Sequence, residues 1–443
     1  MFLAQSRLIL THALPMLVAQ VSSMGMMIID TVLLGHHSTE DLAAVAIGSG
    51  IYIAVLFALA GVVQSVAPVV AHHKGGARDT EVGQALIQSF WLALVLAVPC
   101  AWLIARPQPF FVLTTMDAGV EAKVLLYLGI LAWGVPAALA YRAFYAFCNA
   151  LGEPRALMHI ALAGTCMHGV LAWMLVGGHA GLPELGVAGC AVSNVAVNWF
   201  VFGCGWAYLH RSRALARYHL LRRWAWPRLE VQRELLRLGL PMGMSYFVEV
   251  SSFTLIALLA AQLGAVAVAG HRIVANLAAL CYMLPLAVAL ATLAQVGLAA
   301  GAGDARRARS AALAGCALAT GLSALLGGLL WLGKEPLVAA YSNDVAVCAV
   351  AVSLIVYLAL YQAFDAVQTV AAFALRGYRV TFVPMLVHIV CFWGVGLFGG
   401  WWLAFRAPEP QGLAGFWIAA LSGLVLAAVL LGGLLWRVAR RWG

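Results

Sequence analysis

Twelve long runs of apolar residues constrain this chain more than any other feature of its sequence. The hydrocarbon core of a bilayer is about 30 Å thick, and about 20 apolar residues of α-helix span it. Only helices and closed barrels satisfy the backbone in lipid, and these runs lack the alternation of barrel strands. We therefore predict an all-α membrane protein. Its twelve transmembrane helices are expected at about residues 8–34, 42–71, 85–105, 124–147, 156–177, 185–209, 235–260, 268–299, 310–332, 346–373, 381–404 and 413–436.

The composition agrees with a membrane protein and excludes an ordinary soluble fold. Of the 443 residues, 64% are hydrophobic and 10% are charged, against about 45–50% and about 25% in soluble domains. The net charge of +9 lies in short loops rather than on one face, so we expect no nucleic-acid partner. The nine cysteines form no C-x-x-C pair, and adjacent histidines such as His36–His37 lack metal-ligand spacing, so we expect no resident cofactor.

The basic residues predict the orientation of the chain. With the N-terminus in the cytoplasm, 21 of the 26 Lys and Arg residues fall on the cytoplasmic side and 4 on the other. Such an excess marks the cytoplasmic side of bacterial membrane proteins. We predict a multi-pass protein of the bacterial inner membrane with both termini in the cytoplasm. The first apolar run is too long for a signal-peptide core, so we expect it to remain as the first span.

A long basic loop divides the chain into two halves. We predict an N-terminal lobe at residues 1–210, a basic cytoplasmic linker at 211–237 and a C-terminal lobe at 238–443. Because each half holds six spans, both run the same way through the membrane. They are expected to be two six-helix lobes related by a pseudo-two-fold axis along the membrane normal.

Short matches between the halves support an internal repeat. Leu14–Met16 matches Leu240–Met242 at an offset of 226 residues. Tyr141–Phe144 matches Tyr361–Phe364 at an offset of 220, which would align His168 with His388. The alternative is that apolar sequence aligns with itself by chance.

Three acidic residues, Asp30, Glu249 and Asp365, lie inside apolar spans. A charge near the bilayer centre costs at least about 2.5–3.5 kcal/mol and usually marks an ion or proton pathway. No basic residue pairs with them at helical spacing, since Arg376 is eleven positions from Asp365 and Arg237 is twelve from Glu249. The alternative is a set of protonated acids that hydrogen-bond neighbouring helices.

Polar residues share helix faces with these acids. Tyr361, Asp365 and Gln368 are spaced i, i+4, i+7, and Ser245, Glu249 and Ser252 have the same spacing. A carboxylate in such a stripe can hold a proton, Na⁺ or a cationic substrate. These states compete, which is the minimum needed to couple ion entry to cation exit.

The segments that carry these residues resemble the multidrug and toxic compound extrusion (MATE) transporters, in particular the NorM-type branch. The resemblance covers nearly the whole chain and weakens in the last two spans. Its most specific part is Tyr361–Gln368 followed by Leu375–Tyr378. The other matching segments are Leu14–Thr31, Pro183–Gly189, Phe247–Val250 and Gly270–Asn276.

The resemblance implies a V-shaped secondary transporter that exports cationic amphiphilic small molecules in exchange for Na⁺ or H⁺. Glu249 and Asp365 would bind the cation, including Na⁺, and Tyr361 would contribute its ring. Asn276 and Gln368 would lie near that cation site. We expect membrane lipid as the other partner and a monomer as the working unit.

For the N-terminal lobe, the resemblance implies that Asp30 is the functional acid. The family often carries Asn in the fifth span where this chain has His168. That histidine would either add a proton step near neutral pH or only pack.

Three other functions compete with this interpretation. A lipid-linked saccharide flippase of the same superfamily would need basic residues for its anionic cargo, whereas the intramembrane charges here are acidic. An enzyme would need a nucleophile, phosphate or metal motif, and the sequence carries none. A non-transporting scaffold would not explain three costly acids.

Overall fold

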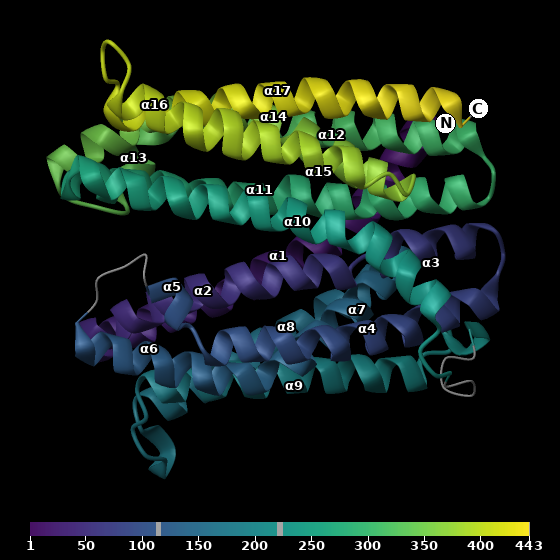
Figure 1. Ribbon diagram of the computed structural model, residues 1–443, viewed down its shortest axis with the longest axis horizontal. Coiled ribbons are helices and arrows are strands. Elements are labelled where there is room, and N and C mark those ends of the chain that lie inside the picture. Colours follow the sequence, from purple (N-terminus) through teal and green to yellow (C-terminus); the bar gives the residue numbers. More distant parts are fainter. Residues whose placement is uncertain (112–116, 219–224, 443) are drawn as a thin grey trace. The chain divides into compact units, whose positions relative to one another are not determined.

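The computed structural model describes residues 1–111, 117–218 and 225–442 of the chain, and the regular structure in these ranges is helical (Figure 1). Arg222 and Arg223 of the predicted linker lie outside the described residues. The elements are α1 Phe2–His37, α2 Thr39–Val63, α3 Val66–Gly75, α4 Asp79–Ala105, α5 Gln108–Phe111, α6 Ala118–Leu131, η1 Ala132–Gly134, α7 Val135–Leu151, α8 Pro154–Val176, η2 His179–Gly181, α9 Val187–Arg211, η3 Ala216–Tyr218, α10 Leu229–Ala260, η4 Ala261–Leu263, α11 Ala265–Gly301, α12 Ala305–Leu332, α13 Lys334–Ala339, α14 Val345–Gly377, α15 Phe382–His388, the π-helix η5 Ile389–Phe398, α16 Gly399–Phe405 and α17 Gly412–Arg441.

Twelve helical segments in the described ranges are long and apolar enough to cross a membrane, which confirms the predicted number of spans. Several of them combine consecutive elements, and proline explains two of the breaks. Pro68 lacks the N–H that would bond to the carbonyl of Gln64, and α2 gives way to α3 at that point. Pro136 likewise cannot bond to Ala132, where the short 3₁₀ turn η1 begins.

Helix boundaries establish the register of the internal repeat. The first residues of α2 and α11, the first residues of α4 and α12, and the last residues of α7 and α14 all differ by 226. This agrees with the match between Pro15 and Pro241. The second predicted match, at an offset of 220, is wrong, because the boundaries of α7 and α14 leave no room for a shift of six residues. His388 is therefore not the repeat counterpart of His168.

The chain forms two compact units. The N-terminal unit is Val18–Gly243, and the C-terminal unit combines Met1–Leu17 with Met244–Gly443. Both crossings between units fall inside a helix, in α1 just after Pro15 and in α10 just after Pro241. Each proline removes one hydrogen bond from its helix and so favours a bend there. The predicted boundaries at residues 210 and 237 follow chain connectivity and stay predictions.

Within the N-terminal unit, small residues let helices approach closely. α8 and α9 run side by side (Figure 1). A Cβ atom built on Gly189 of α9 would lie 2.5 Å from the carbonyl oxygen of Leu175 on α8. Backbone contact of this kind is how membrane helices associate without a hydrophobic driving force.

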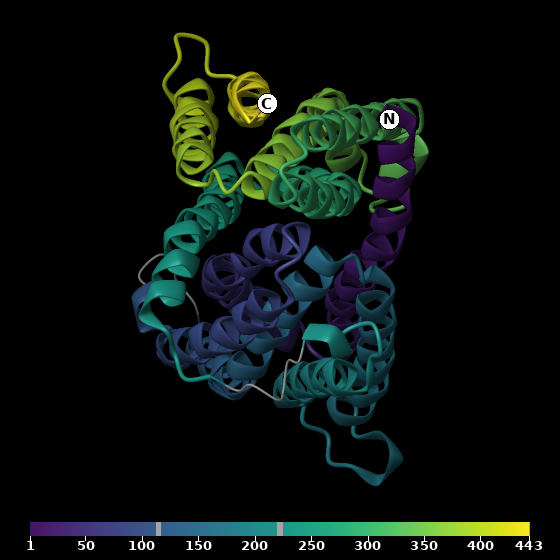
Figure 2. The ribbon, with the colours of Figure 1, turned by 90° about the vertical axis from the view of Figure 1, so that its right-hand side faces the viewer.

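Within the C-terminal unit, α14 is the central helix. It packs against α11, α12 and α17, and its second half is buried almost continuously from Tyr361 to Gly377. The α15–η5–α16 rod lies beside α17 (Figure 2). A polar side chain on the second half of α14 is therefore enclosed by protein and not by lipid.

The close approach of α8 and α9 predicts a stability difference between two glycines of one helix. Gly189→Ala should lower the thermal unfolding midpoint, because overpacking costs about 1–3 kcal/mol. Gly203→Ala is the matched control, since no atom lies within 4 Å of a Cβ at that position. The midpoints are measured by fluorescence-detected size exclusion after heating in detergent. Equal midpoints for the two variants would contradict the packing described here.

Candidate functional site

Asp365 and Gln368 form a buried polar pair on α14. Their side chains are 3% and 2% exposed, and Gln368 Nε2 donates a hydrogen bond to Asp365 Oδ1 at 3.0 Å. They are three residues apart, so they lie on one face of the helix. The shared face predicted from their spacing is therefore present in the fold.

Glu249 of α10 approaches the same region from a second helix. Its carboxylate is a hydrogen-bonding partner of Tyr282 on α11 and lies within electrostatic range of Asp365. Tyr361, one turn before Asp365, is near both acids. Three helices of the C-terminal unit thus bring two carboxylates and two phenols together, an oxygen-rich set that suits H⁺ or Na⁺.

The Tyr361 ring is held in place from α17. Its side chain is 5% exposed and meets the Trp417 ring edge-on, with ring centroids 6.4 Å apart. Trp417 also contacts the His271 ring of α11 at 5.8 Å. The aromatic face predicted for a cation is therefore pre-positioned by packing.

Ser252, which shares the predicted polar face of α10 with Glu249, bonds to another helix. Ser252 Oγ donates to the backbone carbonyl of Phe392 in the π-helix η5, at 3.1 Å. The neighbouring Ser251 Oγ accepts a hydrogen bond from Trp393 Nε1 at 3.0 Å. Ser252 therefore joins two helices, and no hydrogen bond links it to either acid in the described part of the chain.

Arg376 lies at the end of α14 and is buried. It is in the last turn of the helix and is 4% exposed. Nη1 donates to the Tyr246 hydroxyl at 3.1 Å. Eleven residues correspond to just over three whole turns, so Arg376 lies on the same face of α14 as Asp365. That spacing was the available signal.

Asn276 does not join this cluster. Its side chain on α11 is exposed, and no hydrogen bond or ion pair links it to Glu249 or Asp365 among the residues described. Tyr282, six residues later on the same helix, contacts Glu249 instead. The role of Asn276 stays a prediction from the resemblance.

The N-terminal unit holds Asp30 between two other helices. His168 Nε2 of α8 lies 2.8 Å from Asp30 Oδ1, and Asn194 Nδ2 of α9 donates to Oδ2 at 3.2 Å. Asp30 is 8% exposed and His168 is fully buried. The histidine does more than pack, because it is a direct partner of the acid.

Asn194 was not predicted. It and Asn198 are four residues apart on one face of the apolar helix α9, which was the available signal. Asn198 donates to the hydroxyl of Tyr52 at 3.4 Å. Polar pairs along α9 therefore orient both an acid and a phenol inside this unit.

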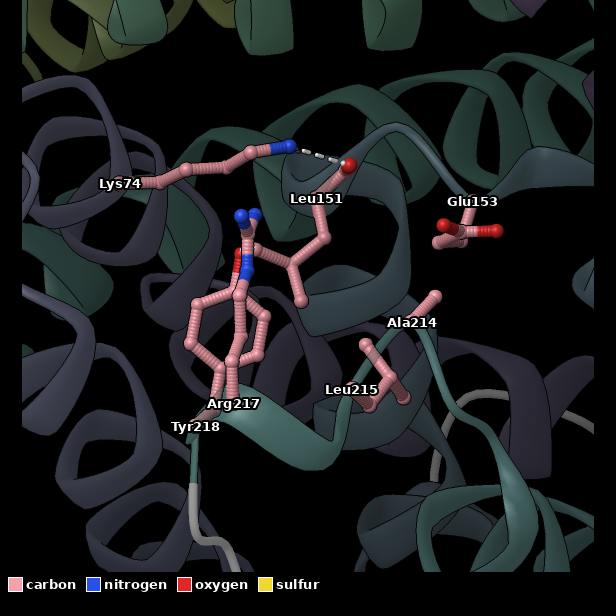
Figure 3. A pocket seen from close by; sticks show the side chains of 7 residues that line it. All are labelled: Lys74, Leu151, Glu153, Ala214, Leu215, Arg217 and Tyr218. Carbon is pink, nitrogen blue, oxygen red and sulfur yellow. Dashed lines mark hydrogen bonds between the residues drawn. The ribbon is translucent and has the colours of Figure 1, made fainter.

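A cavity of about 270 Å³ lies in the N-terminal unit, away from these acids. It is lined by Lys74, Leu151, Glu153, Ala214, Leu215, Arg217 and Tyr218 (Figure 3). The Lys74 ammonium donates to the Leu151 carbonyl at 2.6 Å, and Arg217 donates to the Tyr218 hydroxyl.

These contacts attach the described end of the basic linker to the helices. Burial raises the pKa of the Tyr218 phenol, so it stays neutral near pH 7. None of the predicted site residues lines this cavity. We therefore interpret it as a structural docking site and not as the transport site.

Comparisons with known proteins agree with this arrangement. The MatE family model matches residues 15–174 and 241–402, one stretch in each half of the chain. The chain is 56% identical over 433 residues to a protein of Aromatoleum aromaticum named "Probable multidrug resistance protein NorM", covering 97% of this chain and 94% of that one. It is 39% identical over 445 residues to a protein of the same name from Chromobacterium violaceum, covering 99% and 95%.

A solved structure shares the fold. The eukaryotic MATE transporter AtDTX14 superposes with a TM-score of 0.90 at 19% identity, covering 100% of this chain and 98% of that one. Together with the two-part family match, this shows that the chain belongs to the MATE family and is a membrane transporter of the NorM type, not an enzyme.

Proposed function

We propose that this protein exports organic cations across the bacterial inner membrane in exchange for Na⁺ or H⁺, by alternating access. The observation that carries the proposal is the pair Glu249 and Asp365, two neighbouring acids enclosed in apolar spans. No ion pair neutralises either acid within the described ranges. The multidrug resistance names of the relatives support the export of drugs.

Competition for the two carboxylates explains the exchange. An ionised carboxylate is costly inside an apolar span, so the pair favours a bound cation of some kind. A proton or Na⁺ from outside and an organic cation from inside compete for the same oxygens. After the site has released one cation on one side of the membrane, it returns to the other side only with the other cation bound. This requirement couples the two flows.

The aromatic residues around the acids favour organic cations over simple ions. The rings of Tyr361 and Tyr282 lie beside the carboxylates. A cation over an aromatic face gains about 0.5–2 kcal/mol. We propose that Na⁺ or H⁺ uses the oxygens alone, while the cargo also uses the rings.

Asp30 is proposed as a third functional acid, located in the N-terminal unit. Its pairing with His168 and Asn194 differs from the environment of the other two acids. A carboxylate already bonded to a histidine can exchange a proton with it. We propose a proton step there, with both termini of the chain on the cytoplasmic side of the membrane.

The flippase alternative finds no support. A lipid pyrophosphate cargo is anionic and requires a site with net positive charge. The cluster in the C-terminal unit instead carries two acids and one base. The relatives compared above are named for drug resistance.

The first prediction concerns efflux. Asp365→Asn should reduce ethidium efflux from pump-deficient cells by at least about tenfold, because one of the competing carboxylates is lost. Glu335→Gln, at an exposed acid on α13, should leave efflux unchanged. Efflux is measured by fluorescence with and without Na⁺, and with a protonophore. Undiminished efflux in a well-expressed Asp365→Asn protein would refute the role of this acid.

The second prediction concerns the Asp30–His168 pair. His168→Leu should lower both efflux and the thermal midpoint, because breaking a buried pair costs about 3–5 kcal/mol. In a double-mutant cycle with Asp30→Asn, the coupling should be about 1–3 kcal/mol. Thermal midpoints of the four purified proteins measure it. Additive effects would show that the pair does not act as a unit.

A further inference from the structure

Arg376 is a fixed positive charge inside the C-terminal unit. Its guanidinium carbon lies 4.2 Å from the ring centroid of Phe373 and 4.9 Å from that of Tyr246. The hydrogen bond to the Tyr246 hydroxyl holds it further. Arginine stays charged in proteins, so this side chain contributes a permanent positive charge.

The position of Arg376 relates it to both acids. Tyr246 and Glu249 are three residues apart on α10, so the guanidinium contacts α10 within one turn of Glu249. Glu249 and Arg376 interact electrostatically. Asp365 lies on the same face of α14, eleven residues before Arg376, and is related to Arg376 through Glu249, which interacts with both.

Arg376 interacts with Glu249 but forms no ion pair with either acid in the described part of the unit. No nitrogen of Arg376 lies within 4.0 Å of a carboxylate oxygen in the described part of the unit. Its donor serves Tyr246, while Gln368 and Tyr282 bond to the acids. The carboxylates thus stay available to a mobile cation.

The net charge of this cluster is the sum of the charges on the side chains that face one another. Glu249 and Asp365 contribute two negative charges when ionised, and Arg376 contributes one positive charge. His388 of α15 is 3% exposed and lies close to Arg376, and it is counted as uncharged because burial away from water disfavours the imidazolium form. The phenols of Tyr282 and Tyr361 are neutral. The sum is one negative charge.

We propose that Arg376 is an internal counter-charge that limits this site to one monovalent cation at a time. With it, a single H⁺, Na⁺ or organic monocation neutralises the cluster. Without it, the two acids demand two positive charges and favour a dication. Arg376 would then be a residue that determines specificity, and this inference rests on the function proposed above.

A merely structural Arg376 would brace α10 against α14 and have no effect on the valence of the cargo. Binding affinities for two probes separate the two roles. Tetraphenylphosphonium carries one positive charge, and dequalinium carries two. Their dissociation constants are measured by titration calorimetry on the full-length protein in nanodiscs.

We expect Arg376→Gln to shift the affinity ratio toward the dication by about tenfold or more, since one nearby charge is removed. Arg376→Lys should keep the wild-type ratio. The double variant Asp365→Asn/Arg376→Gln restores a single negative charge, and its ratio should return toward wild type. A structural role predicts no such return.

An unchanged ratio in a folded Arg376→Gln protein that still binds tetraphenylphosphonium would overturn the inference. If that variant does not fold, Asp365→Asn supplies the test with Arg376 intact. The cluster in that variant has no net charge, so its affinity for the monocation should fall by at least about a hundredfold. Retained binding of the monocation would contradict the inference. A wild-type protein that binds neither probe would instead contradict the proposed function itself.

Discussion

The cost of placing a carboxylate inside an apolar helix is the constraint on which this structure depends. Three such acids lie in membrane-spanning helices of this protein, and two of them, Asp30 and Asp365, are buried at 8% and 3% exposed. Asp365 is possible because α14 packs against α11, α12 and α17, which leave this side chain buried. The packing of the helices thus lowers the cost of the acids, and the acids in turn provide binding sites for the exchanged cations.

The partners of the acids differ between the two units. In the N-terminal unit, both carboxylate oxygens of Asp30 have protein partners on α8 and α9. In the C-terminal unit, two acids share one region with a buried guanidinium that pairs with neither. The repeat supplies a common helical frame, since equivalent helices keep an offset of 226. The charged residues are placed on that frame asymmetrically.

Much of this arrangement is readable from the sequence, because hydropathy and helical spacing are local properties. The twelve spans, the three acids inside them and the shared face of Asp365 and Gln368 all follow from such patterns. Contacts between helices are not local. Asn194 and Tyr282 lie in mostly apolar helices, and nothing in their own spans indicates which acid they meet.

The burial of Arg376 also depends on contacts between helices and could not be predicted from its own span. This residue ends a span, where basic residues usually reach the cytoplasm, but aromatic rings on α10 and α14 hold it inside. The repeat failed at the second match for a related reason. Tyr141–Phe144 and Tyr361–Phe364 are similar short strings, and only the helix boundaries show that they occupy different turns.

The most direct test of the central claim is whether cargo binding displaces the coupling ion. Tetraphenylphosphonium would be added to the purified protein in weak buffer while released H⁺ and Na⁺ are recorded. The account predicts release of one of these ions with binding, and loss of that release in Glu249→Gln/Asp365→Asn. Saturable binding of tetraphenylphosphonium without release of either ion would contradict a shared carboxylate site.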